Sequence, residues 1–388
     1  MSDSGAIYIH IPFCVQKCIY CDFYSKTDLS LIPPFIQALI QEIKKRAYKF
    51  ASYPFNFNDK IDTIYFGGGT PSLLSINEVD LLLQTIKETF SILSDAEISF
   101  EINPETVDFN YLKELRNIGI NRLSIGVQSF NHDKLEFLKR IHTADQAINA
   151  VEDAKKAGFL NISLDMIYAV PFETTKLLMQ DLKKAAKMEI VHLSCYMLTI
   201  EPLTPLDKKV KQKFIEPLDR RTMAILFKET VTRLYEFGFE HYEISNFSKG
   251  KAYRSEHNSK YWDIIPYLGF GPGAHSLSGD KRTWNHKSIR HYIKDIISGR
   301  LPVKGFEILD IKQKKLETIM LSLRTLEGID IKKYNTQFNT DFQKEFKEVI
   351  NSVLDSSYGF LCSDSFALNL EGKTCLNNIV EAFAQKIL

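Results

Sequence analysis

Short β-type runs alternate with amphipathic helical stretches through the N-terminal half of the chain, and this alternation constrains the fold most strongly. The β-type runs are rich in Ile, Leu, Val, Tyr or Phe. We expect strands at residues 6–10, 62–66, 97–101, 121–126, 161–168 and 191–196. Apolar residues at three- and four-residue spacing predict helices at 34–48, 77–90, 143–157 and 176–187. Strands joined by helical crossovers form parallel sheets, so six such units predict an open, partial α/β barrel.

The alternation fades after one further expected helix at 220–237. The segment 241–276 is rich in Gly and Pro, which predicts loops. In the tail we expect helices at 314–324, 338–354 and 376–387, and a short β-type pair at 360–362 and 366–370. This order predicts a smaller α+β, winged-helix-like domain. We therefore divide the chain into a core domain, 1–240, and a C-terminal domain, 241–388.

Composition narrows the class of protein. The chain has 388 residues, with 49 Lys and Arg against 48 Asp and Glu, and this near balance argues against a protein that coats nucleic acid. Residues 1–6 lack the basic and apolar regions of a secretory signal. No apolar run approaches the ~20 residues that a membrane helix needs. We expect a cytoplasmic protein.

Three of the six cysteines, Cys14, Cys18 and Cys21, follow the first expected strand with the spacing C-x3-C-x2-C. Functional groups of α/β barrels lie at that end of the strands. Three thiolates can hold three corners of a cubane iron–sulfur cluster and leave the fourth iron open to a small molecule. The alternatives are a zinc site with His10 as fourth ligand, although zinc sites usually use two separated C-x2-C pairs, and three buried, unpaired cysteines.

Other polar and glycine-rich segments follow the next strands. Consecutive glycines at 67–69, before Thr70, allow a ligand to approach the backbone closely, and without a Gly-Lys-Ser/Thr ending they are not a nucleotide P-loop. A simple tight turn is the alternative. Glu101, Gln128 and Asp165 lie in or near the ends of the third, fourth and fifth strands. Each alone is as easily a solvated residue as a ligand, but together they predict convergence at one mouth of the barrel.

These motifs resemble the radical S-adenosylmethionine superfamily, in particular the branch of oxygen-independent coproporphyrinogen III oxidase. The lead-in His10-Ile-Pro-Phe-Cys, the Gly-Gly-Gly-Thr-Pro loop and Gly-Val-Gln-Ser-Phe carry the resemblance, which covers nearly the whole chain. It implies a [4Fe–4S] cluster on the three clustered cysteines. It also implies contacts with S-adenosylmethionine at Tyr8, Tyr20, Gly69, Thr70, Glu101, Gln128, Arg140, Asp165, Thr199 and His275.

Two departures separate the chain from the oxidases. Those enzymes carry a further cysteine where this chain has Phe23, and they have a longer stretch before the position of Tyr8. The chain is more similar to a sister group, the HemW-type heme chaperones, which show C-x3-C-x2-C-x-F and His-Asn-x-x-Tyr-Trp, here at 257–262. The resemblance implies a protein that delivers heme to apoproteins, such as membrane cytochromes of respiration, and it is compatible with a homodimer. The alternative function is the oxidase reaction, and the sequence leaves open whether S-adenosylmethionine is cleaved.

The residue chemistry of the second motif allows a heme site. Imidazole is a common axial ligand of heme iron, so His257 is the candidate ligand. Tyr261 and Trp262 follow closely and could stack on the macrocycle. The alternative is a histidine hydrogen-bonded within a loop, with its aromatic neighbours filling the core.

Overall fold

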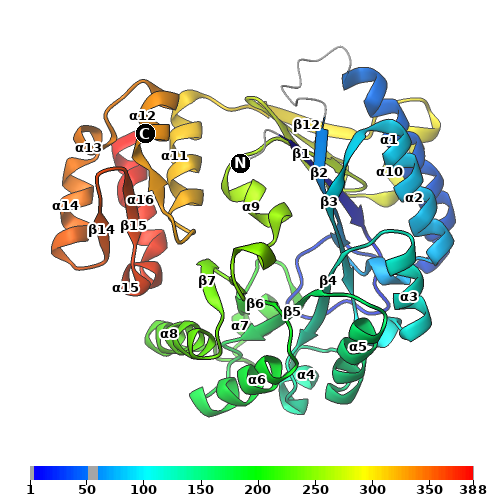
Figure 1. Ribbon diagram of the computed structural model, residues 1–388, viewed down its shortest axis with the longest axis horizontal. Coiled ribbons are helices and arrows are strands. Elements are labelled where there is room, and N and C mark those ends of the chain that lie inside the picture. Colours follow the sequence, from blue (N-terminus) through cyan, green and yellow to red (C-terminus); the bar gives the residue numbers. More distant parts are fainter. Residues whose placement is uncertain (1–3, 51–59, 388) are drawn as a thin grey trace.

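The structure is a computed structural model that describes residues 4–50 and 60–387 (Figure 1). Its main sheet contains twelve strands in the order β12-β11-β10-β9-β1-β2-β3-β4-β5-β6-β8-β7. The six expected strands form its centre as β1 Gly5–Ile11, β2 Lys60–Gly68, β3 Ser91–Ile102, β4 Arg122–Gln128, β5 Asn161–Tyr168 and β6 His192–Met197. Each pairs in parallel with the next, so the predicted open parallel arrangement is present.

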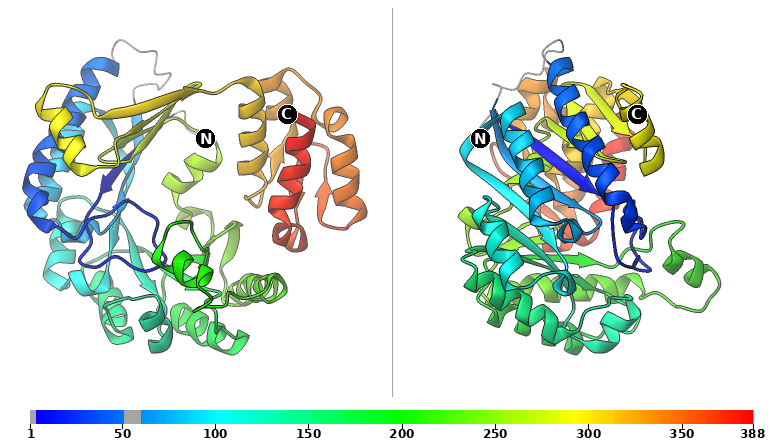
Figure 2. Two further views of the ribbon diagram at one scale, coloured as in Figure 1. Left: turned by 180° about the vertical axis from the view of Figure 1, so that it is seen from behind. Right: turned by 90° about the vertical axis from the view of Figure 1, so that its right-hand side faces the viewer.

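Amphipathic helices cover the outer face of this curved sheet (Figures 1 and 2). They are α1 Ile32–Phe50, α2 Ile76–Thr89, α3 Phe109–Asn117, α4 His132–Phe137, α5 Ala144–Lys156, α6 Thr175–Lys187 and α8 Arg220–Glu236. The helix α7 Pro205–Lys211 lies instead against the loop after β1, where the Leu206 N–H donates to the Ile19 carbonyl at 2.9 Å. Local sequence sets several of their starts. Ser75 with Glu78, and Thr143 with Gln146, form capping boxes that satisfy the first backbone donors of α2 and α5.

Short strands that the sequence analysis did not identify extend the sheet on both sides. β9 Tyr267–Phe270 pairs in parallel with β1, and β10 His275–Ser278, β11 Lys281–Asn285 and β12 Val303–Ile308 continue beyond it. β7 Glu240–Glu243 and β8 Asn246–Ser248 extend the sheet past β6. Most of these strands have three to five residues and lie between Gly and Pro, so their alternation is too brief to distinguish from loop sequence.

The last part of the chain forms a separate layer beside the barrel (Figure 2). Its elements are α11 Ile311–Ser322, β13 Ile329–Asp330, α12 Ile331–Phe338, α13 Phe342–Glu345, α14 Lys347–Asp355, β14 Gly359–Leu361, β15 Ser365–Leu368, α15 Leu370–Thr374 and α16 Leu376–Ile387. The single helix expected at 338–354 is wrong, because Asn339 adopts a left-handed conformation (φ 48°) that ends α12, and the chain restarts as α13 and α14. Phe342, Phe346 and Phe383 pack in this layer's own core.

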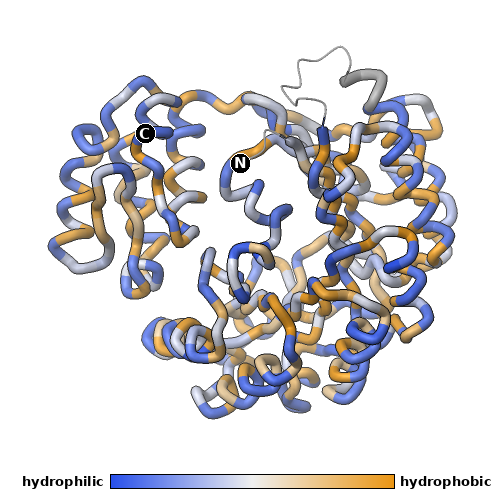
Figure 3. The backbone as a smooth tube through the Cα atoms, viewed as in Figure 1, coloured by the Kyte–Doolittle hydropathy of each residue, from blue (hydrophilic) through white to orange (hydrophobic). Residues whose placement is uncertain are grey.

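The domain boundary at 240/241 stays a prediction. In the structure, β9 to β12 belong to the main sheet, whereas the second hydrophobic core gathers buried residues from Ile319 onward. The prediction that a secretory signal is absent rests partly on residues 1–3, which lie outside the described residues. Within the described ranges, no helix has the length and apolar character needed to cross a bilayer, and the helices alternate polar and apolar residues (Figure 3).

A buried carboxylate fastens the extension of the sheet to α1. Glu42 is 0% exposed and pairs with Arg46 at 2.9 Å. It also accepts hydrogen bonds from the Tyr292 hydroxyl (2.6 Å), the Asn285 amide (2.8 Å) and the Gly271 backbone N–H (2.9 Å). These donors lie on α10 Ile289–Ile297, on β11 and in the turn after β9. One side chain of the barrel therefore fixes the position of the added strands.

We expect Glu42→Gln to lower the free energy of unfolding by ~3–5 kcal/mol, because it leaves the Arg46 guanidinium buried without its counter-charge. Urea denaturation measures the change. Glu88→Gln on α2 is the matched control, because Glu88 is exposed, and its effect should stay within roughly 0.5 kcal/mol. Equal effects of the two substitutions would contradict this account of Glu42.

Candidate functional site

The clustered cysteines lie in the loop that leaves the carboxyl end of β1. The base of this loop is closed by backbone hydrogen bonds from Cys14 to Lys26 and from Lys26 to Pro12. All six cysteines of the chain are free, and Cys14, Cys18 and Cys21 are partly exposed. Their side chains line one cavity of ≈ 420 Å³. The loop therefore presents three thiols to a common space at the carboxyl edge of the sheet.

The donor set of this loop fits an iron–sulfur cluster. Burial raises the pKa of Cys14, and it raises the pKa of Cys21 to about 11, so keeping these groups as thiolates requires a bound cation. Among the described residues, no three His, Cys, Asp or Glu side chains converge closely enough to hold one metal ion. A cubane instead binds each thiolate through a different iron. His10, the candidate zinc ligand, has both ring nitrogens hydrogen-bonded, to Tyr8 and to the Tyr24 carbonyl.

A chain of polar contacts links two of the thiols. The Arg140 guanidinium donates to Cys18 Sγ at 3.7 Å and to Asn103 Oδ1 at 2.7 Å. The Asn103 amide donates to Thr70 Oγ1 at 3.0 Å, and the Thr70 hydroxyl donates to Cys14 Sγ at 3.6 Å. Arg140 Nε is buried without a partner among the described residues, so a donor remains for a bound group. Asn103 is not among the expected site residues, although it stands two residues after Glu101, which is one of them.

Two half-buried carboxyl groups form the floor of the cavity. Glu101, in β3, accepts hydrogen bonds from the Tyr65 hydroxyl (2.9 Å) and the Gly68 backbone N–H (3.1 Å). Burial, together with the nearby charge of Asp165, raises its pKa to about 7. Asp165, in β5, accepts from Ser124 at 2.9 and 3.0 Å, and burial raises its pKa to about 6. Carboxyl groups of this kind are suited to accept hydrogen bonds from ligand hydroxyls.

The glycine loop passes directly against the cysteine loop. Its Gly69 N–H donates to the Ile11 carbonyl at 2.8 Å. A Cβ at Gly69 would lie 2.5 Å from the Phe13 carbonyl oxygen and 2.8 Å from that of Ile11, so no side chain fits there. The close approach expected from consecutive glycines is therefore an approach to the cysteine loop itself, and it brings Thr70 within reach of Cys14.

Most of the predicted site residues line the cysteine cavity, and three lie elsewhere. The lining includes Cys14, Cys18, Cys21, Tyr20, Gly69, Thr70, Glu101, Gln128, Arg140, Asp165 and Thr199. Tyr8 lies instead beside the rings of Tyr65 and His257, which stack on each other. His275 lines a second cavity, beside the strands β9 to β12, and His257 lines neither of these two cavities. The ligand roles of all these residues stay predictions.

His257 is held in the interior on the short helix α9 Glu256–Trp262. His257 is only 1% exposed to solvent. Its Nδ1 is 3.0 Å from the Thr63 hydroxyl oxygen, and its Nε2 is 3.0 Å from the Tyr261 hydroxyl oxygen. Burial lowers its pKa to about 3, so the ring is neutral. Both ring nitrogens are occupied, and a metal could bind this imidazole only after one of the two hydroxyls moves away.

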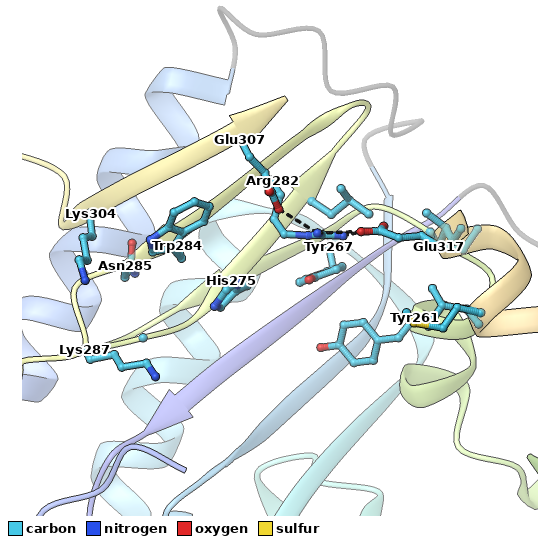
Figure 4. Close-up of a pocket in the computed structure, with 16 residues that line it drawn as sticks. Tyr261, Tyr267, His275, Arg282, Trp284, Asn285, Lys287, Lys304, Glu307 and Glu317 are labelled. Atoms are coloured by element: carbon cyan, nitrogen blue, oxygen red, sulfur yellow. Dashed lines mark hydrogen bonds and ion pairs between the residues drawn. The ribbon is translucent and has the colours of Figure 1, made fainter. Parts of the chain in front are cut away.

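His275 faces a different cavity, of ≈ 650 Å³, between β9 to β12 and the helices α9 and α11 (Figure 4). Its ring stacks near that of Trp284, with the ring centroids 5.9 Å apart and the planes inclined by 28°. Tyr261, from the same motif as His257, also lines this cavity. The resemblance implies a place beside S-adenosylmethionine for His275, whereas in the structure this residue lines the second cavity and not the cysteine cavity.

Two family models and several known proteins are similar to this chain. The family model of the radical SAM superfamily matches residues 8–185, and the HemN C-terminal domain matches 309–365. A protein of Bacillus subtilis named heme chaperone HemW is 31% identical, over 97% of this chain and 98% of its own. The heme chaperone HemW of Escherichia coli is 32% identical, over 97% of each chain.

Among solved structures, coproporphyrinogen III oxidase (HemN) of Escherichia coli, a radical SAM enzyme, superimposes with a TM-score of 0.83. The match covers 98% of this chain and 90% of that one at 23% identity, which shows a common fold. The predicted radical SAM α/β core with a smaller C-terminal domain is thereby confirmed.

The raised pKa of Glu101 predicts a pH-dependent stability. Between pH 4.5 and about 7, the unfolded chain carries this carboxylate while the folded chain keeps it protonated, so the free energy of unfolding falls as pH rises. Glu101→Gln, which cannot ionise, should therefore gain stability relative to the natural chain from pH 5 to pH 8, as measured by urea denaturation. Glu136→Gln, an exposed position on α4, should show no such gain. Parallel pH profiles for Glu101→Gln and the natural chain would contradict the assignment.

Proposed function

We propose that this chain, which belongs to the heme chaperone HemW family, binds heme and delivers it to apoproteins. The observation that carries the proposal is the similarity to heme chaperones over both parts of the molecule, at 31% and 32% identity along nearly the whole length. An alignment of this extent includes the C-terminal layer as well as the radical SAM core. Respiratory cytochromes are the proposed recipients, and the six free cysteines suit a reducing compartment such as the cytoplasm.

The radical SAM family implies a [4Fe–4S] cluster and S-adenosylmethionine. In our proposal, Cys14, Cys18 and Cys21 hold the cluster, and the polar chain through Arg140 and Thr70 orients two of their sulfur atoms. When bound and reduced, the cluster supplies an electron that can cleave S-adenosylmethionine.

For S-adenosylmethionine itself, we propose a place in the cysteine cavity. Glu101 and Asp165 accept hydrogen bonds from the ribose hydroxyls of S-adenosylmethionine. The segment of Gly69 and Thr70 binds its methionine moiety. Tyr20, Gln128 and Thr199 complete the lining. The cluster and this ligand together would control heme transfer or formation of a homodimer.

The relatives favour the chaperone over the oxidase. Phe23, where the oxidases carry a further cysteine, is 61% exposed and lines the cysteine cavity. A phenyl ring cannot donate a thiolate, so this position offers no further sulfur ligand. The match to HemN is one of fold, whereas the more similar full-length relatives are named heme chaperones.

Removal of one proposed cluster ligand should prevent the chain from holding the iron–sulfur cluster. We expect Cys18→Ser, after anaerobic reconstitution with iron and sulfide, to lose most of its iron and its cluster absorbance, because only two thiolates remain. Iron and sulfide assays with absorbance spectra measure this loss. Cys362→Ser is the matched control, because Cys362 is exposed in the C-terminal layer and should leave the iron content unchanged. Full cluster loading of Cys18→Ser would exclude Cys18 as a ligand.

Heme delivery is tested by transfer. We expect the cluster-loaded chain, incubated with a limiting amount of hemin, to pass the heme to membrane vesicles that contain heme-free respiratory cytochromes. Difference spectra of the re-isolated vesicles should show cytochrome bands that form faster than with the same amount of free hemin. Serum albumin loaded with hemin serves as the control for passive release. Failure of the chain to bind hemin saturably, or transfer no faster than from albumin, would contradict the proposal.

A further inference from the structure

The cavity around His275 has an apolar side and an aromatic side. The segment that follows α9 contributes Ile264 and Ile265, and α11 contributes Met320 and Leu321. Tyr261, Tyr267 and Trp284 add flat aromatic surface (Figure 4). A volume of ≈ 650 Å³ with such walls suits a large planar ligand, because ligand cavities bury apolar rings against apolar and aromatic side chains.

The charges of this cavity are divided between its two ends. At one end, Arg282 is neutralised by Glu307 and Glu317, each at 2.8 to 2.9 Å. At the other end lie Lys287 and Lys304, which are exposed and form no ion pair within the described ranges (Figure 4). Two uncompensated ammonium groups on one side of an apolar cavity favour a ligand that carries carboxylates along one edge.

The imidazole of His275 is free to bind a metal. Its ring contact is with Trp284, and within residues 4–50 and 60–387 neither ring nitrogen is in a hydrogen bond. The side chain is exposed and lines the cavity (Figure 4). His257 differs in each respect, because it is buried and both of its nitrogens are hydrogen-bonded.

We propose that heme binds in this cavity, with His275 as an axial ligand of its iron and with Lys287 and Lys304 facing its two carboxylates. This inference rests on the proposed function and gives it a site. The iron–nitrogen bond forms by donation of an imidazole lone pair, and no electron is transferred.

His257 then acts as a positioning residue. Its Nε2 is hydrogen-bonded to the hydroxyl of Tyr261, whose ring packs edge-on against Tyr267 at a centroid distance of 4.8 Å. Both tyrosines are walls of the cavity. The histidine of the motif therefore supports the aromatic wall from behind, while the ligand atom comes from β10.

The test is a hemin titration of the cluster-loaded full chain, followed by heme difference absorbance and by electron paramagnetic resonance of the ferric iron. We expect His275→Ala to change the Soret maximum and the spin state and to weaken binding by about tenfold or more, with added imidazole restoring the spectrum.

His257→Ala should weaken binding but keep the natural spectrum. Lys287→Gln with Lys304→Gln should weaken binding without a spectral change. His291→Ala and Lys294→Gln, both exposed on α10, are the matched controls.

The outcomes separate the inference from the function. A natural spectrum and affinity in His275→Ala, or loss of the ligand signature in His257→Ala alone, would overturn the assignment of His275 while heme binding stands. No saturable binding by the natural chain would overturn the proposed function and the inference with it.

Discussion

The strands β1 to β6 pair in parallel, each with the next, and this pairing brings the site residues together. In a parallel sheet all carboxyl ends lie at one edge, so the segments that follow six successive strands meet there. Cys14 follows β1, Thr70 follows β2 and Asn103 follows β3, and Arg140 completes the polar chain between two sulfur atoms. Residues separated by more than a hundred positions thus become neighbours without any local sequence signal.

Burial at this edge raises the pKa values of its two carboxyl groups. Glu101 and Asp165 lie on β3 and β5, deep enough that burial raises both pKa values, and each raises the cost of a second negative charge nearby. Glu42 shows the opposite arrangement, with a counter-charge on Arg46 and three further donors. The first pair is left with capacity for ligand hydrogen bonds, whereas Glu42 is saturated, and this difference separates a binding surface from a structural anchor.

The sequence predicted what depends on local pattern. Strand positions followed from apolar runs, and the cysteine spacing located a loop that the structure places beside the glycines and the carboxyl groups. Asn103 escaped because a single amide after a strand resembles any loop residue. The strands β7 to β12 escaped because their sequences are short, and because β8 and β9, which attach them to the sheet, pair with β6 and β1 from earlier in the chain. The break at Asn339 also escaped, since apolar periodicity continues across it.

The two histidines show why a motif identifies a region more securely than a ligand atom. Spacing within the motif at 257–262 selects His257, but α9 turns that imidazole toward Thr63 and Tyr261, where its lone pair is already used. Metal ligation needs an accessible nitrogen as well as the right residue type. The strand pairing that attaches β9 to β1 brings β10 alongside, and with it His275, an imidazole that faces open space beside cations and aromatic rings. Tyr261 and His275 meet in one cavity only after the sheet has folded. The ligand-binding properties of this cavity therefore depend on the tertiary structure and not on the motif alone.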